Sequence, residues 1–296
     1  MESTYYSING TIVPEERAVV PVTDRGFLYG DGLFETLHAY GQTIFRFDTH
    51  LERLLNGART LHFNPLPDPK QLKRWVLEAI AHAHFPEANV RLTVTRGSGP
   101  RGPSLKGPLQ SRTIITVTKF ERPPEARFTE GVSAVVASFR RQESATTANL
   151  KTLNYIEQIL AKREADAAGA DEAILLNNAG IVCEGSASNI ALIRDGILRV
   201  PDPKRVGALP GVAMLTAIEA AHAAKIPVTM TLLSPWDLHQ SAEGFLTGSM
   251  REITPLVRVG EKVVGDGNPG PVTKKILAGF RKIIEKECKP FRFPKG

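Results

Sequence analysis

The chain has 296 residues, of which 42% are hydrophobic and 23% are charged. This composition is typical of a folded globular protein and too apolar for intrinsic disorder, and the length suits one large domain or two of ordinary size. No run of about 18 apolar residues occurs, which excludes a membrane-spanning helix. The first residues lack the basic and apolar regions of a signal peptide.

The cysteine and histidine content excludes two further classes. Only Cys183 and Cys288 occur, so a disulfide framework is excluded and a reducing cytoplasm is expected. The seven histidines show no metal-ligand spacing, so no metal site is expected. The formal charge of +6 includes a basic C-terminal segment, but Glu285 and Glu287 interrupt it. A solvated helix face is therefore favoured over a nucleic-acid surface.

Hydrophobic periodicity and turn residues predict an α/β (α+β) chain. Helices are expected at residues 49–61, 69–84, 155–168, 211–224 and 271–286. Strands are expected at 5–8, 11–13, 33–40, 43–47, 90–95, 112–118, 132–137, 172–176, 180–183, 189–193 and 228–232.

A proline-containing stretch that is poor in apolar residues indicates a domain boundary in the middle of the chain. Pro123 and Pro124 lie in this stretch. We therefore expect a smaller N-terminal α/β domain over residues 1–122, a linker region at 123–131, and a larger, strand-rich C-terminal domain over 132–296.

Two nucleotide-binding motifs and one hydrolase motif can be set aside. Residues 97–102 match GxGxxG, but Pro100 and Pro103 prevent the helix that would present its amides to a dinucleotide. This stretch is better explained as a mobile loop that carries Arg101. Neither a P-loop nor a GxSxG elbow occurs, which argues against ATP-driven and serine-hydrolase chemistry.

Lys151 is the unusual lysine of the sequence. It is the only charged residue between Glu143 and Glu157. A lysine with apolar neighbours and no carboxylate beside it in sequence is suited to a lowered pKa, which a Schiff-base amine needs. A surface lysine at a helix start would have the same local sequence, so composition alone leaves both interpretations open.

Three further segments could form part of a site. Glu184 follows apolar strand residues and precedes small residues that would let a flat ligand approach, although an exposed glutamate at a strand end explains this segment better when it is taken alone. Gly211 precedes a predicted helix whose first amides, from Val212 and Ala213, could bind an anion, as could those of other helices. Ser249 lies in a small-residue turn where its hydroxyl could meet a phosphate.

Taken together, these segments resemble fold-type IV pyridoxal-phosphate enzymes. That family includes branched-chain aminotransferases, D-amino-acid transaminases and aminodeoxychorismate lyases. The resemblance rests on six ordered segments and covers nearly the whole chain: 24–36 (DRGFLYGDGLFET), 50–54 (HLERL), 151–155 (KTLNY), 184–189 (EGSASN), 209–211 (LPG) and 253–255 (ITP).

The resemblance implies a pyridoxal-phosphate site and assigns its residues. Lys151 would bind the cofactor as a Schiff base and move the proton during the reaction. Glu184 would hold the protonated pyridine nitrogen, and Tyr155 would lie near the phenolic oxygen. The phosphate would be held by Arg53, the amides of Val212 and Ala213, and the Ser249 hydroxyl. The family also implies a homodimer or a larger assembly.

Different segments of the sequence resemble subfamilies that act on different substrates. Residues 248–255 (GSMREITP) and 270–275 (GPVTKK) resemble branched-chain aminotransferases, whereas 95–101 (TRGSGPR) and 150–154 (LKTLN) resemble D-amino-acid transaminases and the lyases. His38 and Arg251 depart from the branched-chain pattern, which usually has an arginine and a small residue there. Pro103 departs from the D-specific pattern, which has a histidine two residues after the loop arginine.

The sequence thus predicts a transaminase that acts on an amino acid, with branched-chain L-amino acids favoured, and on 2-oxoglutarate. A D-amino-acid transaminase and an aminodeoxychorismate lyase are the alternatives within the fold. A binding protein without catalysis is disfavoured because Lys151 and Glu184 are intact. The expected substrate-binding residues are Tyr29, Phe34, His38, Arg101, Met250 and Arg251.

Overall fold

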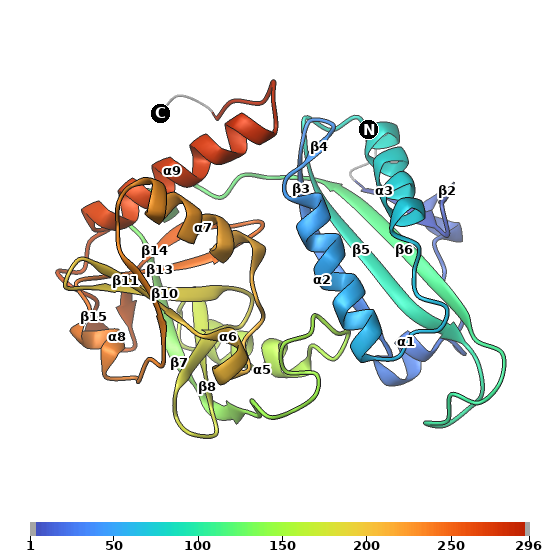
Figure 1. Cartoon of the computed structure of the whole chain (residues 1–296), viewed down its shortest axis with the longest axis horizontal. Coiled ribbons are helices and arrows are strands. Elements are labelled where there is room, and N and C mark those ends of the chain that lie inside the picture. Colours follow the sequence, from blue (N-terminus) through green and yellow to red (C-terminus); the bar gives the residue numbers. More distant parts are fainter. Residues whose placement is uncertain (1–3, 294–296) are drawn as a thin grey trace. The chain divides into compact units, whose positions relative to one another are not determined.

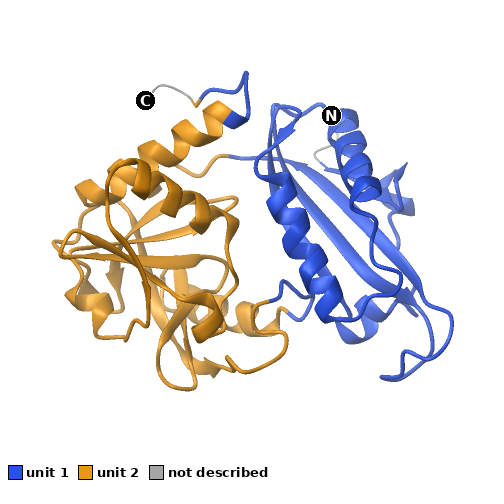
Figure 2. Ribbon diagram, viewed as in Figure 1, with its two compact units in different colours: residues 1–121, 150–154, 287–292 blue, residues 122–149, 155–286, 293–296 orange. Residues whose placement is uncertain are grey.

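The computed structural model describes residues 4–293, which fold into two compact units (Figures 1 and 2). Unit 1 contains residues 4–121 together with residues 150–154 and 287–292. Unit 2 contains residues 122–149, 155–286 and 293. Both units combine helices with a β-sheet, which confirms the predicted α/β class.

The elements follow one another along the chain in this order: β1 (Thr4–Ile8), β2 (Thr11–Val13), the 3-10 turn η1 (Glu15–Arg17), α1 (Arg25–Tyr29), β3 (Gly32–Tyr40), β4 (Thr43–Ile44), α2 (Phe47–Thr60), α3 (Pro69–Ala83), β5 (Glu87–Ser98), β6 (Gln110–Lys119), α4 (Ala126–Thr129), β7 (Val132–Arg141), α5 (Ile156–Ala167), β8 (Glu172–Asn177), β9 (Val182–Gly185), β10 (Asn189–Arg194), β11 (Ile197–Pro201), α6 (Pro203–Val206), α7 (Val212–Ala223), β12 (Val228–Thr231), α8 (Asp237–Gln240), β13 (Glu243–Gly248), β14 (Glu252–Val259), β15 (Lys262–Val263) and α9 (Pro271–Glu287).

Unit 1 is built on an antiparallel sheet with the strand order β2-β1-β6-β5-β3-β4. Helices α2 and α3 cover one face of this sheet (Figure 1), where Leu37 and Leu92 pack with Leu51 of α2 and Val76 of α3. Because side chains alternate along a strand, the residues between these apolar ones point to the opposite face. That second face carries Phe34 and His38 of β3, whereas Glu35 has the same parity as Leu37 and lies on the face that α2 covers.

Local sequence signals explain where several elements of unit 1 begin and end. Asn9 and Gly10 have φ values of 51° and 84°, the left-handed conformation that a two-residue hairpin turn between β1 and β2 requires. Helix α3 starts after Asp68, whose carboxylate accepts the Lys70 N–H at 3.0 Å, and Pro69 occupies the first turn.

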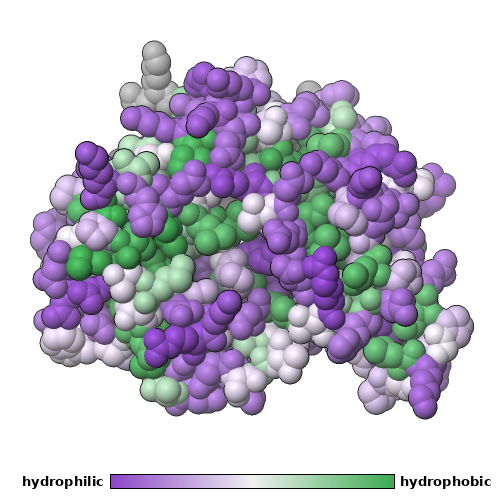
Figure 3. All heavy atoms as spheres, in the orientation of Figure 1, coloured by the Kyte–Doolittle hydropathy of each residue, from purple (hydrophilic) through white to green (hydrophobic). Residues whose placement is uncertain are grey.

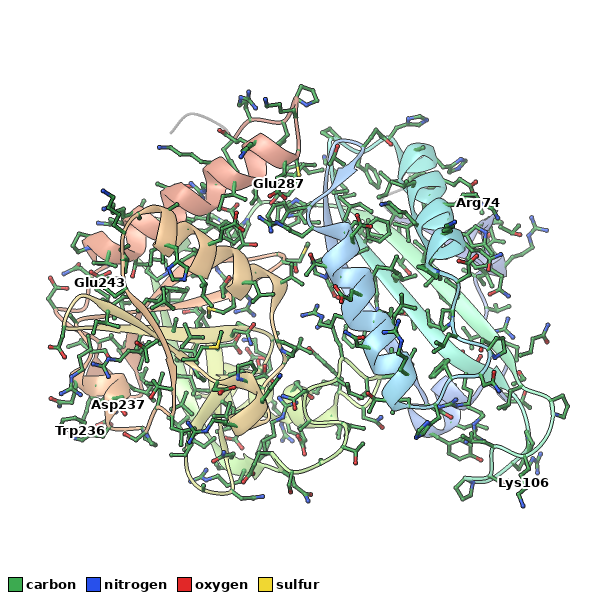
Figure 4. All side chains as sticks on the ribbon, viewed as in Figure 1. Arg74, Lys106, Trp236, Asp237, Glu243 and Glu287 are labelled. Atoms are coloured by element: carbon green, nitrogen blue, oxygen red, sulfur yellow. The ribbon has the colours of Figure 1, made fainter. Side chains whose placement is uncertain are left out.

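Unit 2 is built on a mixed sheet with the strand order β12-β11-β10-β13-β14-β7-β8-β9, and β15 pairs with β14. Helix α5 packs on β7 and β8 through small residues such as Ala161 and Ala173. The start of α9 is capped by the buried Glu243, whose carboxylate accepts the N–H groups of Val272 at 3.0 Å and Thr273 at 2.7 Å (Figure 4). Apolar side chains gather on the surface over α7 (Figure 3).

The structure corrects two of the predicted strands. The strand expected at 180–183 is β9, at Val182–Gly185, because the backbone and side-chain oxygens of Asn177 accept the N–H groups of Gly180 and Ile181 and form a turn there. Glu184 therefore lies within the strand. The strand expected at 43–47 ends at Ile44, because Arg46 has a φ of 53° and α2 begins at the next residue.

Several elements had no clear periodic signal. These are α1, β11, which lies between β12 and β10, and the β13–β14 hairpin, which lies in the middle of the unit 2 sheet. The stretch predicted as a linker contains the single-turn helix α4. Within residues 4–293, no helix has the length and apolar character needed to cross a membrane. The same residues contain no group of three or more metal-ligating side chains.

Candidate active site

Lys151 is positioned by backbone pairing at the edge of the unit 1 sheet. Its carbonyl oxygen accepts the Phe34 N–H at 3.0 Å, and the Leu153 N–H donates to Gly32 at 3.1 Å. The segment thus adds to β3 like a short antiparallel strand. Gly32 is required at this crossing, since a Cβ atom there would meet Leu153 at 2.6 Å and the Val94 carbonyl at 2.8 Å.

The surroundings of Lys151 favour its neutral form. Burial and the nearby Arg53 and Arg91 guanidinium groups lower the pKa of the Lys151 amine to about 8, while Glu35 opposes this shift. The Nζ atom lies 4.6 Å from the centre of the Phe34 ring. The fold therefore gives Lys151 the perturbed amine that its local sequence suggested, but through neighbours that are distant along the chain.

A buried charged cluster lies beside this lysine. Arg53 donates to Glu35 through two hydrogen bonds, from Nε at 2.8 Å and from Nη2 at 2.6 Å, and His50 Nδ1 lies 2.8 Å from the same carboxylate. Burial alone would raise the pKa of Glu35, but Arg53 and His50 lower it to about 2. Burial lowers the pKa of His50, against the effect of Glu35. Glu35 is therefore an anion that fixes the plane of the Arg53 guanidinium.

Glu184 is a buried carboxylate in unit 2 and is held from three sides. Oε1 accepts a hydrogen bond from Arg141, which is itself 7% exposed. Oε2 accepts the Leu209 N–H at 2.9 Å and the Asn189 amide at 3.3 Å. A carboxylate has about four acceptor positions, so this one can accept a further donor.

The start of α7 lies next to Glu184 in the same unit. Asn189 also donates to the Leu209 carbonyl at 2.9 Å, and a Cβ atom on Gly211 would overlap its side chain, so the start of α7 approaches Asn189 closely. The first-turn amides of α7 belong to Val212 and Ala213, both buried. Such amides have no partner within their own helix.

The Ser249 turn lies beside the same residues. Asn189 pairs with Thr247 in the β10–β13 ladder, and the Thr247 hydroxyl donates to the Glu252 carbonyl at 2.7 Å across the turn. Glu252 has a φ of 55° and its buried carboxylate is paired with Arg281 at 2.6 Å. This pairing holds the unusual backbone of the turn that carries Ser249.

A pocket within unit 2 joins Tyr155 to Arg251. Tyr155 directly precedes α5, and Ser186 and Ala187 also line the pocket. Arg251 donates to the fully buried Glu172 at 2.9 Å. Arg251 therefore already has a carboxylate partner, which was not expected from the sequence.

The other predicted substrate residues lie in different places. The Tyr29 hydroxyl accepts the Gly102 N–H at 2.8 Å and so holds the loop of the exposed Arg101, whose tip carries Lys106 (Figure 4). This loop is also held by Arg25, which donates to three of its carbonyl groups. It is thus anchored at several points, whereas the sequence suggested a mobile loop.

His38 lies on the same face of β3 as Phe34 but four residues further, which is about 13 Å along a strand. It is buried between Tyr40 and Phe120, and its Nε2 atom lies 3.1 Å from Glu87. The structure therefore places His38 away from the Lys151 end of the strand. Met250 lies in the Ser249 turn and is half-buried.

The predicted site residues thus form two groups. Lys151, Arg53 and Phe34 lie together in unit 1, and Glu184, Val212, Ala213, Ser249 and Tyr155 lie in unit 2.

The sequence profile of the family described as amino-transferase class IV matches residues 32–259. The chain belongs to amino-transferase class IV.

Relatives of this class IV aminotransferase are named for different activities. A Methanocaldococcus jannaschii protein, provisionally named a branched-chain-amino-acid aminotransferase, is 34% identical over 94% of this chain and 96% of its own. D-alanine aminotransferase of Listeria monocytogenes is 31% identical over 97% of this chain and 99% of its own.

Solved structures share the fold, which confirms the predicted fold-type IV architecture. The Escherichia coli branched-chain amino acid aminotransferase has a TM-score of 0.91 at 28% identity, and the alignment covers 98% of this chain and 97% of that one. The T.th. branched-chain enzyme complexed with N-(5'-phosphopyridoxyl)-L-glutamate has a TM-score of 0.89 at 26% identity, covering 98% and 96%. The 4-amino-4-deoxychorismate lyase of Pseudomonas aeruginosa has a TM-score of 0.84 at 32% identity, covering 94% and 98%.

Four residues near the predicted site of this aminotransferase were not singled out from sequence. Glu35 and His50 lie inside the quoted segments, and the signal that could have found Glu35 is an acid within an apolar strand. Arg91 and Arg141 lie on strands, and the residues around them in sequence do not set them apart from other arginines. Only the fold brings them to Lys151 and Glu184.

Proposed function

We propose that this class IV aminotransferase uses pyridoxal 5'-phosphate to move an amino group between an amino acid and 2-oxoglutarate, with branched-chain L-amino acids as the favoured donors. The observation that carries the proposal is Lys151, an amine whose pKa is lowered to about 8 beside Arg53. A neutral amine of this kind can bind an aldehyde covalently and can accept a proton.

The residue types in the predicted phosphate-binding set fit the phosphate of such a cofactor. A phosphate dianion prefers guanidinium groups, hydroxyls and the first amides of a helix. Arg53, Ser249, Val212 and Ala213 supply these groups, and Gly211 keeps the start of α7 close to Asn189. We propose that these four residues hold the phosphate.

Glu184 fits the pyridine nitrogen. Arg141 pairs with this carboxylate, and the remaining acceptor position of Glu184 suits an N–H donor from a protonated ring. Tyr155, in the same unit, would hold the phenolic oxygen. We therefore propose Glu184 and Tyr155 as the residues that orient the ring.

When bound, the cofactor would supply a conjugated ring that accepts the electron pair left at the substrate α-carbon. The chain's own residues would move the proton and hold the charged groups in place. Lys151 Nζ, as a neutral amine, would take the proton from the α-carbon of the donor, and in the second half of the transfer it would give a proton to the α-carbon of the amino acid formed from the oxo acid. Glu35 holds Arg53 in place, and Arg141 holds the Glu184 charge.

The proposed substrate residues include apolar walls. Phe34 and Met250 are the apolar residues of the proposed substrate set, and such walls suit aliphatic side chains. Tyr29 and Arg101 lie together at the anchored loop and are proposed to border the substrate. The names of the M. jannaschii and E. coli proteins favour branched-chain donors, and the Listeria protein keeps D-amino acids as the alternative.

The attachment of the cofactor is tested by reduction with borohydride followed by peptide mapping. We expect the reduced cofactor on Lys151. We expect Lys151→Ala to abolish turnover while the protein still folds and binds the cofactor without a covalent bond. Attachment to another lysine would show that the assignment is wrong.

The reaction class is tested with the loaded enzyme and one substrate at a time. An L-amino acid alone should abolish the absorption band of the bound aldehyde form, and 2-oxoglutarate should restore it. A matched panel of D-amino acids decides stereospecificity. If no amino acid changes the band while aminodeoxychorismate yields pyruvate, the lyase alternative is correct.

We also propose a homodimer or a larger homo-oligomer, in the cytoplasm. Val22 and Phe27 in unit 1 are 74% and 72% exposed, which is unusual for apolar side chains of this size and suits a protein interface. Both cysteines are buried free thiols, which suits a reducing compartment. Light scattering of the purified protein measures the assembly.

A further inference from the structure

Glu172 is a fully buried carboxylate of unit 2 to which the proposed function assigns no role. It is the first residue of β8. The backbone N–H of Ser186 donates to its Oε1 atom at 3.1 Å, and the Ser186 hydroxyl donates to the same oxygen. The Ser188 hydroxyl donates to Oε2 at 2.8 Å, and Arg251 Nη1 lies 2.9 Å from that oxygen. Both carboxylate oxygens are therefore bound by two segments that are distant from each other in sequence.

The first of these segments is the turn that joins Glu184 to Asn189. The Gly185 N–H closes this turn by donating to the Ser188 carbonyl at 2.7 Å. The turn packs directly on Glu172, because a Cβ atom on Gly185 would meet Cδ and Cγ of Glu172 at 3.1 Å. Since Glu184 immediately precedes Gly185, a shift of the turn would also move the Glu184 carboxylate.

The second segment is the turn that carries Ser249. The Arg251 N–H closes it by donating to the Gly248 carbonyl at 3.0 Å. The two turns lie side by side, since a Cβ atom on Gly248 would come within 3.5 Å of the Ala187 carbonyl. The Arg251 side chain reaches from the second turn to the Glu172 carboxylate. One buried carboxylate thus links the backbone that carries Glu184 to the backbone that carries Ser249.

We infer that Glu172 is a positioning residue of the cofactor site. It fixes the turn of Glu184 directly and the turn of Ser249 through Arg251. The inference rests on the proposed function, in which Glu184 meets the ring nitrogen and Ser249 meets the phosphate. These two groups belong to one molecule, so both contacts form together only if the turns keep a fixed separation. The inference concerns the affinity for the cofactor before any reaction takes place.

Glu243 provides a matched comparison in the same unit. It is also a buried carboxylate that accepts backbone N–H groups, but both of its partners belong to the start of α9 (Figure 4). Glu243 and Gly248 lie at opposite ends of β13, about 17 Å apart along an extended strand. Glu243 therefore supports the fold of unit 2 at a distance from both turns.

The test measures how tightly the cofactor-free protein binds pyridoxamine 5'-phosphate, which has the ring and the phosphate but no aldehyde for Lys151. We expect Glu172→Gln and Arg251→Met to weaken binding about 10- to 100-fold, the range known for residues that orient the ligands of a metal. Arg251→Lys keeps the cation and should recover most of the affinity. Glu243→Gln also removes a charge from the interior of unit 2 but should keep wild-type affinity. If Glu172→Gln does not fold, the two Arg251 variants decide the test.

The double variant separates positioning from direct contact. Glu172→Gln combined with Arg251→Met should bind no more weakly than the weaker single variant, because both changes break the same link. Losses that multiply would show that Arg251 acts on the cofactor itself and would overturn the inference. Wild-type affinity in both single variants, or an equal loss in Glu243→Gln, would overturn it as well.

Two signals from the bound cofactor report the two turns. The phosphorus resonance reports the surroundings of the phosphate at Ser249, and the absorption of the ring reports its nitrogen at Glu184. At saturating pyridoxamine 5'-phosphate, Glu172→Gln should change both signals, and Glu243→Gln should change neither. A change in one signal alone would contradict a link between the turns.

The wild-type protein keeps this test separate from the proposed function. If it does not bind pyridoxamine 5'-phosphate, or if borohydride fixes the cofactor to a lysine other than Lys151, the proposed function fails and the inference falls with it. If the wild type passes both checks and the variants bind equally well, the positioning role of Glu172 alone is wrong.

Discussion

Glu35 and Arg53 form a bidentate pair in which both carboxylate oxygens are used, at 2.8 Å and 2.6 Å. Glu35 is completely buried, and His50 lies 2.8 Å from it. A buried pair of this kind costs a great deal to break, because the remaining charge stays in a poorly solvated place. The position of the Arg53 guanidinium and the stability of unit 1 therefore depend on the same ion pair.

Glu35→Gln should lower the free energy of unfolding by about 3 kcal/mol at neutral pH. The folded pKa of about 2 lies below the ordinary 4.5, so this contribution is complete above pH 4.5 and disappears as the pH falls toward 2. Urea unfolding of both proteins from pH 7 to 2 checks this. Glu78→Gln, which removes an exposed pair, is the control and should cost less than about 0.5 kcal/mol. A difference that stays constant down to pH 2 would contradict the assigned charge.

Lys151 should be the most reactive lysine of the cofactor-free protein below pH 9. Its pKa of about 8, against an ordinary 10.5, leaves about a tenth of it neutral at pH 7. Labelling with an amine-reactive reagent, followed by peptide mapping, should show a midpoint near pH 8 for Lys151. Lys106, on the exposed loop, provides the comparison (Figure 4). A midpoint for Lys151 equal to that of Lys106 would contradict the lowered pKa of Lys151.

Glu184→Gln should reduce kcat by about 100-fold or more while it changes cofactor affinity much less. An amide cannot keep a pyridine nitrogen protonated, although it can still occupy the same space. Stopped-flow kinetics and cofactor titration separate the two effects. Glu164→Gln, on α5, tests the general effect of losing an acid in unit 2. Near wild-type turnover in Glu184→Gln would remove Glu184 from the site.

Arg251→Met should destabilise unit 2 by about 2 kcal/mol, because Glu172 would lose its cationic partner while it stays buried. Arg101→Met should change stability by less than about 0.5 kcal/mol, since Arg101 is exposed. Thermal unfolding of the two variants measures this difference. We expect Arg251→Met to slow glutamate and leucine equally. A loss confined to glutamate would instead assign Arg251 to the second carboxylate of the substrate.

Sequence patterns predicted the elements that have strong local signals. Helix α3 has a capping aspartate, an N-terminal proline and a regular apolar face, and the predicted bounds of 69–84 differ by one residue from those observed. The β13–β14 hairpin was missed because the buried residues of both strands run without alternation, so no two-residue period is visible. The strand predicted from Gly180 begins two residues later, at Val182, because the turn at Asn177 depends on a side-chain hydrogen bond.

The candidate site was predictable where the residue itself carries the chemistry. Lys151 and Glu184 stood out as charges in apolar surroundings. The charges that act on them did not, because Arg91 and Arg141 are brought near by strand pairing and by the packing of unit 2. Arg251 could be recognised as a departure from the family pattern, but its partner Glu172 lies far away in sequence.

The strand-like pairing of residues 150–154 with β3 means that the amine and the sheet it belongs to are encoded far apart. A fragment that stops at residue 121 would contain every strand of the unit 1 sheet but not Lys151. A short synthetic peptide with the sequence of residues 150–154 would restore the segment that carries the amine, and residues 287–292 are the other segment that unit 1 takes from later in the chain. Fragment complementation could therefore introduce a non-natural amine at this position, without changing any codon of the larger fragment.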